Sequence, residues 1–167
     1  GRSELDHVVV EGGGVARTAG IRVAGSSPIL RDVVVRSSVH RGISVEPGGA
    51  PEIVGGSVTG TTGGDGTGIH LAAGSAARIE DVEIAGNSGA GIVNEGSRSR
   101  IRFTTLSGNG QEGLRSTSGA LALHDGSVSG QGVPVRNLDP ASHAVDARRQ
   151  WWGNAAGPTG LAGRVEY

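Results

Sequence analysis

A repeat of about 22 residues runs through most of this 167-residue chain and strongly constrains its fold. Glycine followed by an aliphatic residue recurs, and the aliphatic residues are Ile21, Ile43, Ile69, Ile92, Leu114 and Val133. A second aliphatic series has a similar spacing and consists of Ile29, Ile53, Ile79, Ile101, Leu123 and Val145. A third follows five residues later and consists of Val34, Val58, Ile84, Leu106 and Val128. Because a unit of this size cannot close a core by itself, the repeat predicts coils that stack on one another.

Within each unit, short segments rich in Val and Ile are separated by turns rich in Gly, Ser and Asn, which predicts β-strands rather than helices. The residues of a strand alternate, so that Ile21 and Val23 are expected to point inward and Arg22 outward. The inward column that starts at Val23 continues as Val45, Leu71, Asn94, Ser116 and Val135. The middle coils are therefore expected to bury polar groups that need hydrogen-bond partners.

Polar turn residues also repeat. Asn87 and Asn109 are 22 residues apart and predict stacked amides in a turn. Asp32, Asp81 and Asp125 occupy near-equivalent turn positions in different coils. The Gly-rich segment 63–66 predicts a bulging loop in which Asp65 is a turn residue.

The two ends of the repeat carry distinctive segments. Residues 5–13 read LDHVVVEGG, and residues 145–154 read VDARRQWWGN and are followed by Gly157-Pro158. Together with the repeat, they resemble the right-handed parallel β-helix repeat proteins of the pectate-lyase-like superfamily, which includes many secreted and bacterial surface proteins. The resemblance covers about residues 5–160. It implies an all-β, right-handed parallel β-helix, a solenoid of about seven coils.

Trp151 and Trp152 follow the last coil. The open end of a solenoid exposes apolar core and strand edges, and something must cover them. We therefore predict a Trp-containing C-terminal cap, with coils over residues 1–154 and a cap or tail over residues 155–167.

Composition narrows the functional classes. The formal net charge is −1, so no overall field attracts nucleic acid, and none is expected as a partner. No apolar run is long enough to span a bilayer, so membrane insertion is not expected. The absence of cysteine excludes a disulfide framework and cysteine-based metal sites. The chain opens on Gly1 in mid-pattern, so other domains of the same longer chain are expected.

The outward residues of the strand after each Gly-aliphatic pair form the first candidate site. One column reads Arg22, Ser44, His70, Val93 and Arg115, and a second, two residues on, reads Ala24, Glu46, Ala72, Glu95, Thr117 and Arg136. The candidate ligand-binding residues are Glu46, His70, Glu95 and Arg115. If the chain is an enzyme, the catalytic candidates are His70, Glu95 and Arg115.

The resemblance implies that a groove on this kind of face carries the sugar chain. A lyase needs a base and a cation, often Ca²⁺, beside the uronate carboxylate. A hydrolase needs two carboxylates about 5–9.5 Å apart. Glu46 and Glu95 are two coils apart, and a separation of ~10 Å follows from the strand spacing. This distance is slightly too long for a hydrolase.

A second candidate is the column Glu80, Arg102, His124 and Asp146, whose members are 22 residues apart. The alternation of charge predicts pairing of Glu80 with Arg102 and of His124 with Asp146, which avoids like charges on adjacent strands. We interpret this column as structural, with His124 and Asp146 as the acid–base pair if it is functional. No metal site is expected from the ligand spacing.

These features favour a non-catalytic extracellular or cell-surface module, either a structural spacer or a weak carbohydrate binder, with polysaccharide as its partner and no cofactor. The alternative is a polysaccharide-degrading enzyme, a lyase or glycoside hydrolase that acts on an acidic glycan along the flat strand face. In the lyase case Ca²⁺ would be its cofactor.

Overall fold

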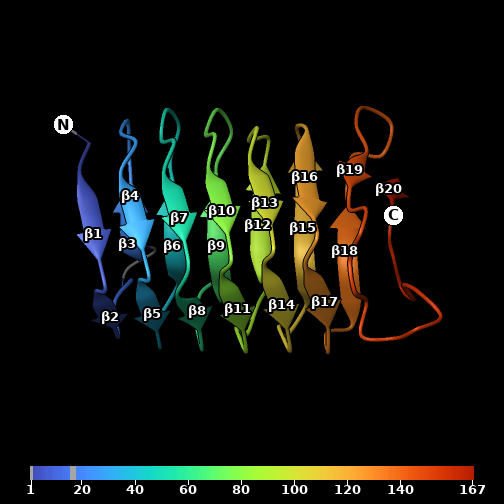
Figure 1. Cartoon of the computed structure of the whole chain (residues 1–167), viewed down its shortest axis with the longest axis horizontal. Coiled ribbons are helices and arrows are strands. Elements are labelled where there is room, and N and C mark those ends of the chain that lie inside the picture. The colour runs from blue at the N-terminus through green and yellow to red at the C-terminus, as the bar shows by residue number, and fades with distance from the viewer. Residues whose placement is uncertain (1, 16–17) are drawn as a thin grey trace.

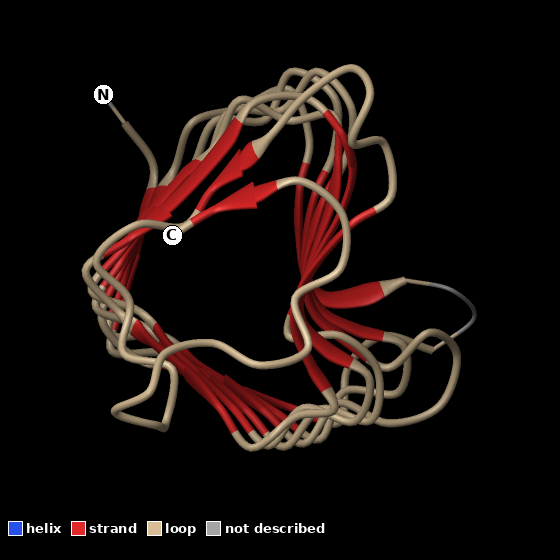
Figure 2. Cartoon of the chain, turned by 90° about the vertical axis from the view of Figure 1, so that its right-hand side faces the viewer, coloured by secondary structure: helices blue, strands red, loops and turns tan. Residues whose placement is uncertain are grey.

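The computed structural model describes residues 2–15 and 18–167, which form a parallel β-solenoid of about seven turns (Figure 1). The regular structure of these residues consists entirely of β-strands, so no helix in the described ranges could cross a membrane. Viewed along the axis, three sheets form the sides of a triangle and the turns form its corners (Figure 2). The predicted all-β parallel solenoid is confirmed.

The chain visits sheets A, B and C in turn. In spatial order, sheet A contains β1 (Glu4–Asp6), β4 (Ile29–Arg31), β7 (Glu52–Val54), β10 (Arg78–Glu80), β13 (Arg100–Arg102), β16 (Leu121–His124), β19 (Val145–Asp146) and β20 (Val165–Glu166). Sheet B contains β2 (Val9–Glu11), β5 (Val34–Arg36), β8 (Ser57–Thr59), β11 (Glu83–Ala85), β14 (Thr105–Ser107) and β17 (Ser127–Ser129). Sheet C contains β3 (Ala19–Val23), β6 (Arg41–Val45), β9 (Thr67–Leu71), β12 (Ile92–Glu95), β15 (Glu112–Ser118) and β18 (Val133–Asn137).

Aliphatic columns fill the interior, as the repeat predicts. In sheet A, Ile79, Ile101 and Leu123 lie in successive register and are fully buried. Sheet B contributes Val58, Ile84, Leu106 and Val128, and sheet C contributes Ile43, Ile69, Ile92 and Leu114. These columns belong to one continuous core, because each coil covers the apolar face of the next.

At the N-terminal end, two expected column members are shifted by one residue. Leu30, rather than Ile29, pairs with Ile53 and is buried. Val35, rather than Val34, pairs with Val58. Each position has two adjacent aliphatic residues, so the sequence alone cannot tell which one points inward, and a one-residue shift reverses the face.

At the C-terminal end, the 22-residue spacing also fails. Val135 pairs with Leu114, whereas Val133 pairs with Glu112. Val145 pairs with Leu121 rather than with Leu123. The physical reason is that the turn before β18, residues 130–132, is shorter than the corresponding turns of earlier coils, whereas the turn before β19, residues 138–144, is longer. The spacing between equivalent residues therefore changes at both places.

The inward polar column is confirmed in the middle coils and corrected at its end. Asn94 pairs with Ser116, and Ser116 pairs with Asn137 instead of Val135. The Asn94 side chain donates to Ser116 Oγ at 3.1 Å and accepts from the backbone N–H of Ser97 at 2.9 Å. These bonds offset the cost of burying the amide.

The amide ladder is present. Asn87 Nδ2 donates to Asn109 Oδ1 at 2.9 Å, and the Asn87 backbone N–H donates to the same oxygen at 3.2 Å. Asn87 Oδ1 in turn accepts from the backbone N–H of Thr61 at 3.0 Å. The ladder therefore joins three successive coils at the corner between sheets B and C.

The three aspartates that the sequence places at near-equivalent turn positions all lie at the corner between sheets A and B. Asp32, Asp81 and Asp125 all have a left-handed backbone, with φ of 48°, 55° and 60°. Aspartate tolerates this conformation better than most residues, because its short side chain can hydrogen-bond locally.

The C-terminal segment returns across the end of the solenoid. Trp151 forms a bridge with Ser127 of sheet B, Ala162 forms one with Arg136 of sheet C, and β20 pairs with β19 of sheet A. The Trp152 side chain packs against the core and meets Tyr167 edge-on, with ring centroids 6.5 Å apart, whereas Trp151 is 55% exposed. Capping by the two tryptophans stays a prediction.

Candidate functional site

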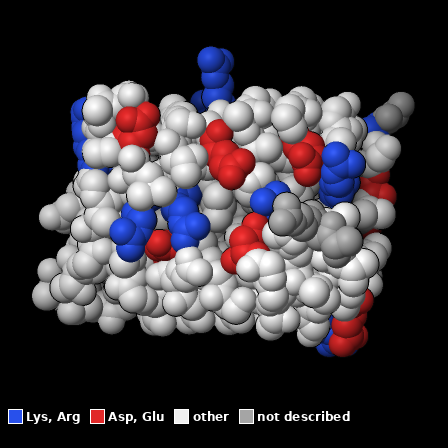
Figure 3. Space-filling view, turned by 180° about the vertical axis from the view of Figure 1, so that it is seen from behind, with Lys and Arg blue, Asp and Glu red and all other residues white. Residues whose placement is uncertain are grey.

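The outer face of sheet C carries the residues that the sequence singled out. Its acidic and basic side chains are interspersed rather than segregated by sign (Figure 3). One column follows the register Arg22, Ser44, His70, Val93, Arg115 and Arg136. The placement of Arg136 in the second column is therefore wrong.

The second outward column is interrupted. The pairing of β12 with β15 shifts between Asn94 and Glu95, so Glu95 lies opposite Ser118 rather than Thr117. A register irregularity of this kind re-aims the side chains beyond it. Thr117 of β15 is left unpaired in the register by this shift, and on the other side of β12 Glu95 contacts the imidazole of His70 in β9.

His70 is buried although its strand position faces outward, with 4% of its surface exposed. Its Nε2 lies 3.1 Å from Glu95 Oε2, which is close enough for an ion pair. The two groups are not aligned for a hydrogen bond. Its Nδ1 lies 3.4 Å from Ser44 Oγ. Each ring nitrogen of the imidazole is thus in contact with another protein group.

Burial lowers the pKa of His70 below its ordinary value of 6.5, and the nearby Arg41 guanidinium acts in the same direction. The Glu95 carboxylate opposes this shift without overcoming it. His70 is therefore neutral at pH 7.

We expect the protein to lose stability as the pH falls below about 6.5, because the unfolded chain then binds a proton that folded His70 does not. Urea unfolding at about pH 7.5 and about pH 5.5 measures the change. A His70→Gln variant should lose less stability over this interval than the unsubstituted protein. His7→Gln is the matched control, since the His7 side chain is 74% exposed. Equal losses in the His70→Gln variant and the unsubstituted protein would contradict this assignment.

Glu46 is held by its neighbours on the same face. It accepts hydrogen bonds from Ser44 Oγ at 3.0 Å and from Arg22 Nε at 3.3 Å. Partial burial favours the neutral acid, but the bonds from Ser44 and Arg22 outweigh it and leave the pKa of Glu46 lowered. The carboxylate is ionised and stably oriented.

A cleft of about 390 Å³ opens beside Glu46. Its walls are formed by Thr18, Ala19, Arg22, Arg41, Ser44 and Glu46. Two guanidinium groups, two hydroxyls and one carboxylate supply both donors and acceptors. This combination can bind sugar hydroxyl or carboxylate groups.

Asp65 is the centre of a small polar cluster that shares Arg41 with the cleft. It accepts from Arg41 Nε at 2.8 Å, lies 3.0 Å from His40 Nδ1, and accepts from the Thr67 backbone N–H at 3.3 Å. Burial raises the pKa of Asp65, but the bond from Arg41 and its charge outweigh burial and lower it. Asp65 is thus a turn residue, as expected, that also orients Arg41 towards the cleft.

A buried carboxylate that the sequence reasoning missed controls Arg115. Glu112 is buried and accepts from Arg115 at 2.7 Å and from Arg136 at 2.8 Å. Arg115 also donates to Gln111. Arg115 is therefore directed towards Glu112 and not towards His70. The sequence did contain a signal for this contact, because Glu112 is three positions before Arg115 and one coil before Arg136.

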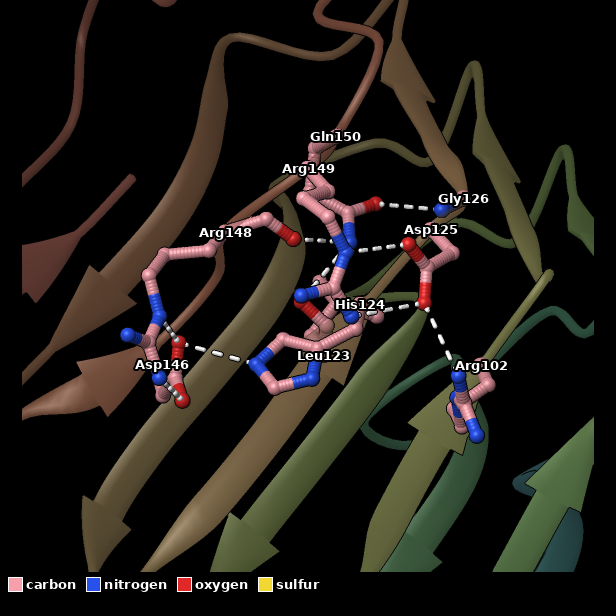
Figure 4. A network of polar contacts seen from close by, with 9 residues as sticks. All are labelled: Arg102, Leu123, His124, Asp125, Gly126, Asp146, Arg148, Arg149 and Gln150. Atoms are coloured by element: carbon pink, nitrogen blue, oxygen red, sulfur yellow. Dashed lines mark hydrogen bonds and ion pairs between the residues drawn. The ribbon is translucent and has the colours of Figure 1, made fainter.

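The second candidate column lies on sheet A, and its polar network extends to the C-terminal segment (Figure 4). His124 Nε2 lies 2.8 Å from Asp146 Oδ1, which confirms that pair even though Asp146 is in register with Ala122. The predicted Glu80–Arg102 pair is replaced by other partners. Glu80 pairs with Arg78 at 2.9 Å, and Arg102 pairs with Asp125 at 3.2 Å.

Two carboxylates anchor this network. Asp125 accepts two bonds from Arg149, which lower the pKa of Asp125, and Arg102 adds to the effect. Asp146 likewise accepts two bonds from Arg148, which lower the pKa of Asp146, with His124 contributing. Both carboxylates are therefore ionised and engaged, as expected for a structural network.

One group of potential metal ligands occurs among the described residues: Asp6, His7 and Asp32, with ligand atoms within 4.8 Å of one another. All three side chains are exposed, and they contact each other, with His7 Nδ1 at 2.7 Å from Asp6 and Nε2 at 3.7 Å from Asp32. Both ring nitrogens of His7 therefore face carboxylates of neighbouring residues.

Comparisons with protein-family models, curated proteins and solved structures found no match. The functional argument therefore depends on the fold and on the geometry of these surfaces.

Proposed function

We propose that this chain is a non-catalytic extracellular module of the right-handed parallel β-helix class. It acts as a rigid spacer in a longer surface or secreted protein and binds carbohydrate weakly on the outer face of sheet C. Continuous parallel ladders and one uninterrupted core support the spacer role, because a solenoid of stacked coils has no internal hinge.

The non-catalytic proposal is based on one observation: the acid and base groups on this face are already engaged by neighbouring protein groups. His70 is buried between Ser44 and Glu95, Glu46 is bonded to Ser44 and Arg22, and Glu112 is enclosed by two arginines. A general base must reach the proton that it removes, within hydrogen-bond distance of the substrate. His70 does not meet this condition.

The cleft beside Glu46 supports the binding part of the proposal. Arg22 and Arg41 present forked donors, while Ser44 and Glu46 supply acceptors. The cleft is open to solvent and lacks an aromatic stacking surface, so binding is expected to be weak, with a Kd on the order of 1 mM.

A polysaccharide panel tests the proposal by two readouts on the same protein. Binding is measured on a glycan array, and lyase turnover is measured by the absorbance of unsaturated uronate products. We expect binding without product. An Arg22→Ala, Glu46→Gln double variant should weaken binding several-fold, because it removes a donor and an acceptor from the cleft. Arg36→Ala is the matched control on sheet B, where Arg36 pairs with Glu11.

Product that forms with the unsubstituted protein and disappears in His70→Gln would overturn the non-catalytic proposal and favour the polysaccharide lyase. Failure to bind any glycan would overturn the carbohydrate part.

A further inference from the structure

Three potential metal ligands lie at the corner between sheets A and B, in the adjacent coils of β1 and β4 (Figure 1). Asp6 ends β1 and His7 follows it, while Asp32 follows β4. Asp6 is in register with Arg31, and the His7 backbone N–H donates to the Arg31 backbone oxygen at 3.0 Å. His7 and Asp32 therefore occupy equivalent positions of adjacent coils, and both have a left-handed backbone, with φ of 51° and 48°.

The next coil leaves room for the Asp32 carboxylate. Gly55 follows β7 as Asp32 follows β4, and a Cβ at Gly55 would collide with Asp32 Oδ1. The other carboxylate oxygen, Oδ2, lies 3.7 Å from His7 Nε2. The glycine thus allows the carboxylate to lie across the corner, with one oxygen facing the imidazole.

The separations between the ligand atoms suit a small divalent ion. Zn²⁺ binds imidazole nitrogen and carboxylate oxygen at about 2.0–2.2 Å, which places two ligands of a tetrahedral ion about 3.3–3.5 Å apart. The 3.7 Å between His7 Nε2 and Asp32 Oδ2 is close to this separation. The ligand atoms of Asp6, His7 and Asp32 all lie within 4.8 Å of one another. Because the three side chains are exposed, small rotations about their side-chain bonds can bring all three to one ion.

His7 is also the most accessible imidazole of the chain. Its side chain is 74% exposed, whereas the side chains of the other four histidines are 5–18% exposed. The chain has no cysteine, so no thiolate competes for a metal ion. An ion added to the folded protein therefore meets one accessible imidazole, and this imidazole is flanked by carboxylates.

The negative charge of this group is not compensated by arginine. Within residues 2–15 and 18–167, Asp6 and Asp32 form ion pairs only with His7. At the same corner near the C-terminal end, Asp125 is instead held by two bonds from Arg149. A neutral imidazole leaves the carboxylates of Asp6 and Asp32 uncompensated, and a divalent cation would balance their two charges.

We propose that Asp6, His7 and Asp32 bind a divalent transition-metal ion of the zinc class, and that this ion links the coils of β1 and β4. Imidazole is a typical ligand of zinc and nickel, whereas calcium and magnesium take oxygen ligands. Three protein ligands leave at least one coordination position for water. The site lies outside the cleft on sheet C and does not depend on the proposed carbohydrate binding. The ligand spacing in the sequence did not predict it, because Asp32 reaches His7 only through the stacking of coils.

Isothermal titration calorimetry of the full chain, without a histidine tag and at about pH 7.5, where an ordinary imidazole is neutral, tests the site. We expect a single Zn²⁺ ion to bind per chain, Ni²⁺ to bind as well, and Ca²⁺ to give no measurable heat at the same concentration. His7→Gln and Asp32→Asn should each weaken Zn²⁺ binding by about tenfold or more, because each removes a direct ligand. In thermal unfolding, saturating Zn²⁺ should raise the Tm of the unsubstituted protein by several degrees, since the ion joins two coils only in the folded chain.

Asp81→Asn is the matched control. Asp81 lies at the same corner, is exposed and has a left-handed backbone, but it forms no ion pair with a histidine among the described residues. This variant should bind Zn²⁺ and gain Tm as the unsubstituted protein does. Without metal, all variants should have nearly the Tm of the unsubstituted protein, because the substituted side chains are exposed.

Unchanged Zn²⁺ affinity in Asp32→Asn would overturn the proposal, since the ion would then bind the imidazole alone. Equal weakening in Asp81→Asn and Asp32→Asn would overturn it as well, because the effect would then be one of overall charge. The absence of Zn²⁺ binding with a Kd below about 1 mM, or tighter binding of Ca²⁺ than of Zn²⁺, would have the same consequence. None of these outcomes bears on the cleft on sheet C.

Discussion

Ile101→Ala should lower the free energy of unfolding by about 2–5 kcal/mol, because truncation of a buried aliphatic side chain loses transfer free energy and leaves a cavity. Ile101 is fully buried between Ile79 and Leu123 in the sheet A column. The neighbouring coils cannot collapse into the space without breaking the ladders that hold them in register. For a chain of this length, the loss corresponds to a fall of roughly 4–20 °C in Tm. Urea unfolding and thermal denaturation, followed by circular dichroism, measure it.

The matched control is Ile29→Ala. The recurrence of aliphatic residues in the sequence places Ile29 in the same column, but Ile29 lies opposite Glu52 and is only partly buried. We expect this substitution to cost about 1 kcal/mol. Similar losses at the two positions would show that the column does not run through Leu30 and Ile101 as the register indicates.

Gly91→Ala should destabilise the protein by about 3 kcal/mol, because the added Cβ would overpack the interior. An ideal Cβ at Gly91 would lie 2.7 Å from the backbone oxygen of Gly113 and 2.8 Å from Asn109 Nδ2. Neither atom can move freely, since Gly113 belongs to β15 and Asn109 to the amide ladder. The expected fall in Tm is roughly 6–12 °C.

Gly132→Ala is the matched control for Gly91→Ala. Gly132 precedes an aliphatic residue as Gly91 does, but the register is displaced there, and the nearest atom to an added Cβ is the Gln111 backbone oxygen at 3.9 Å. We expect a change in unfolding free energy within about 0.5 kcal/mol. A large loss at Gly132, or a negligible one at Gly91, would contradict the assignment of which glycines allow close approach of the coils.

The cleft on sheet C is balanced in charge. Its charged groups pair with one another, as Glu46 does with Arg22, and it offers both donors and acceptors. Binding in this cleft should therefore depend only weakly on ionic strength.

The sequence by itself determined the stacking of coils. Residues such as Ile79 and Ile101 recur at a nearly constant spacing, and inward and outward positions alternate within each strand, so the aliphatic columns can be read without coordinates. The amide ladder of Asn87 and Asn109 follows from the same reasoning, as do the equivalent turn positions of Asp32, Asp81 and Asp125.

Only the tertiary structure decided which of two adjacent aliphatic residues faces the core, as with Ile29 and Leu30, and which charged groups meet. Partners on neighbouring coils are more than twenty residues apart, and the turns between them vary in length. Glu80, for example, lies in register with Arg102 but pairs with Arg78, whereas His124 pairs with Asp146 although Asp146 is in register with Ala122. The periodicity fixes which residues can stack, but side-chain pairing depends on distances of a few ångströms that periodicity does not specify.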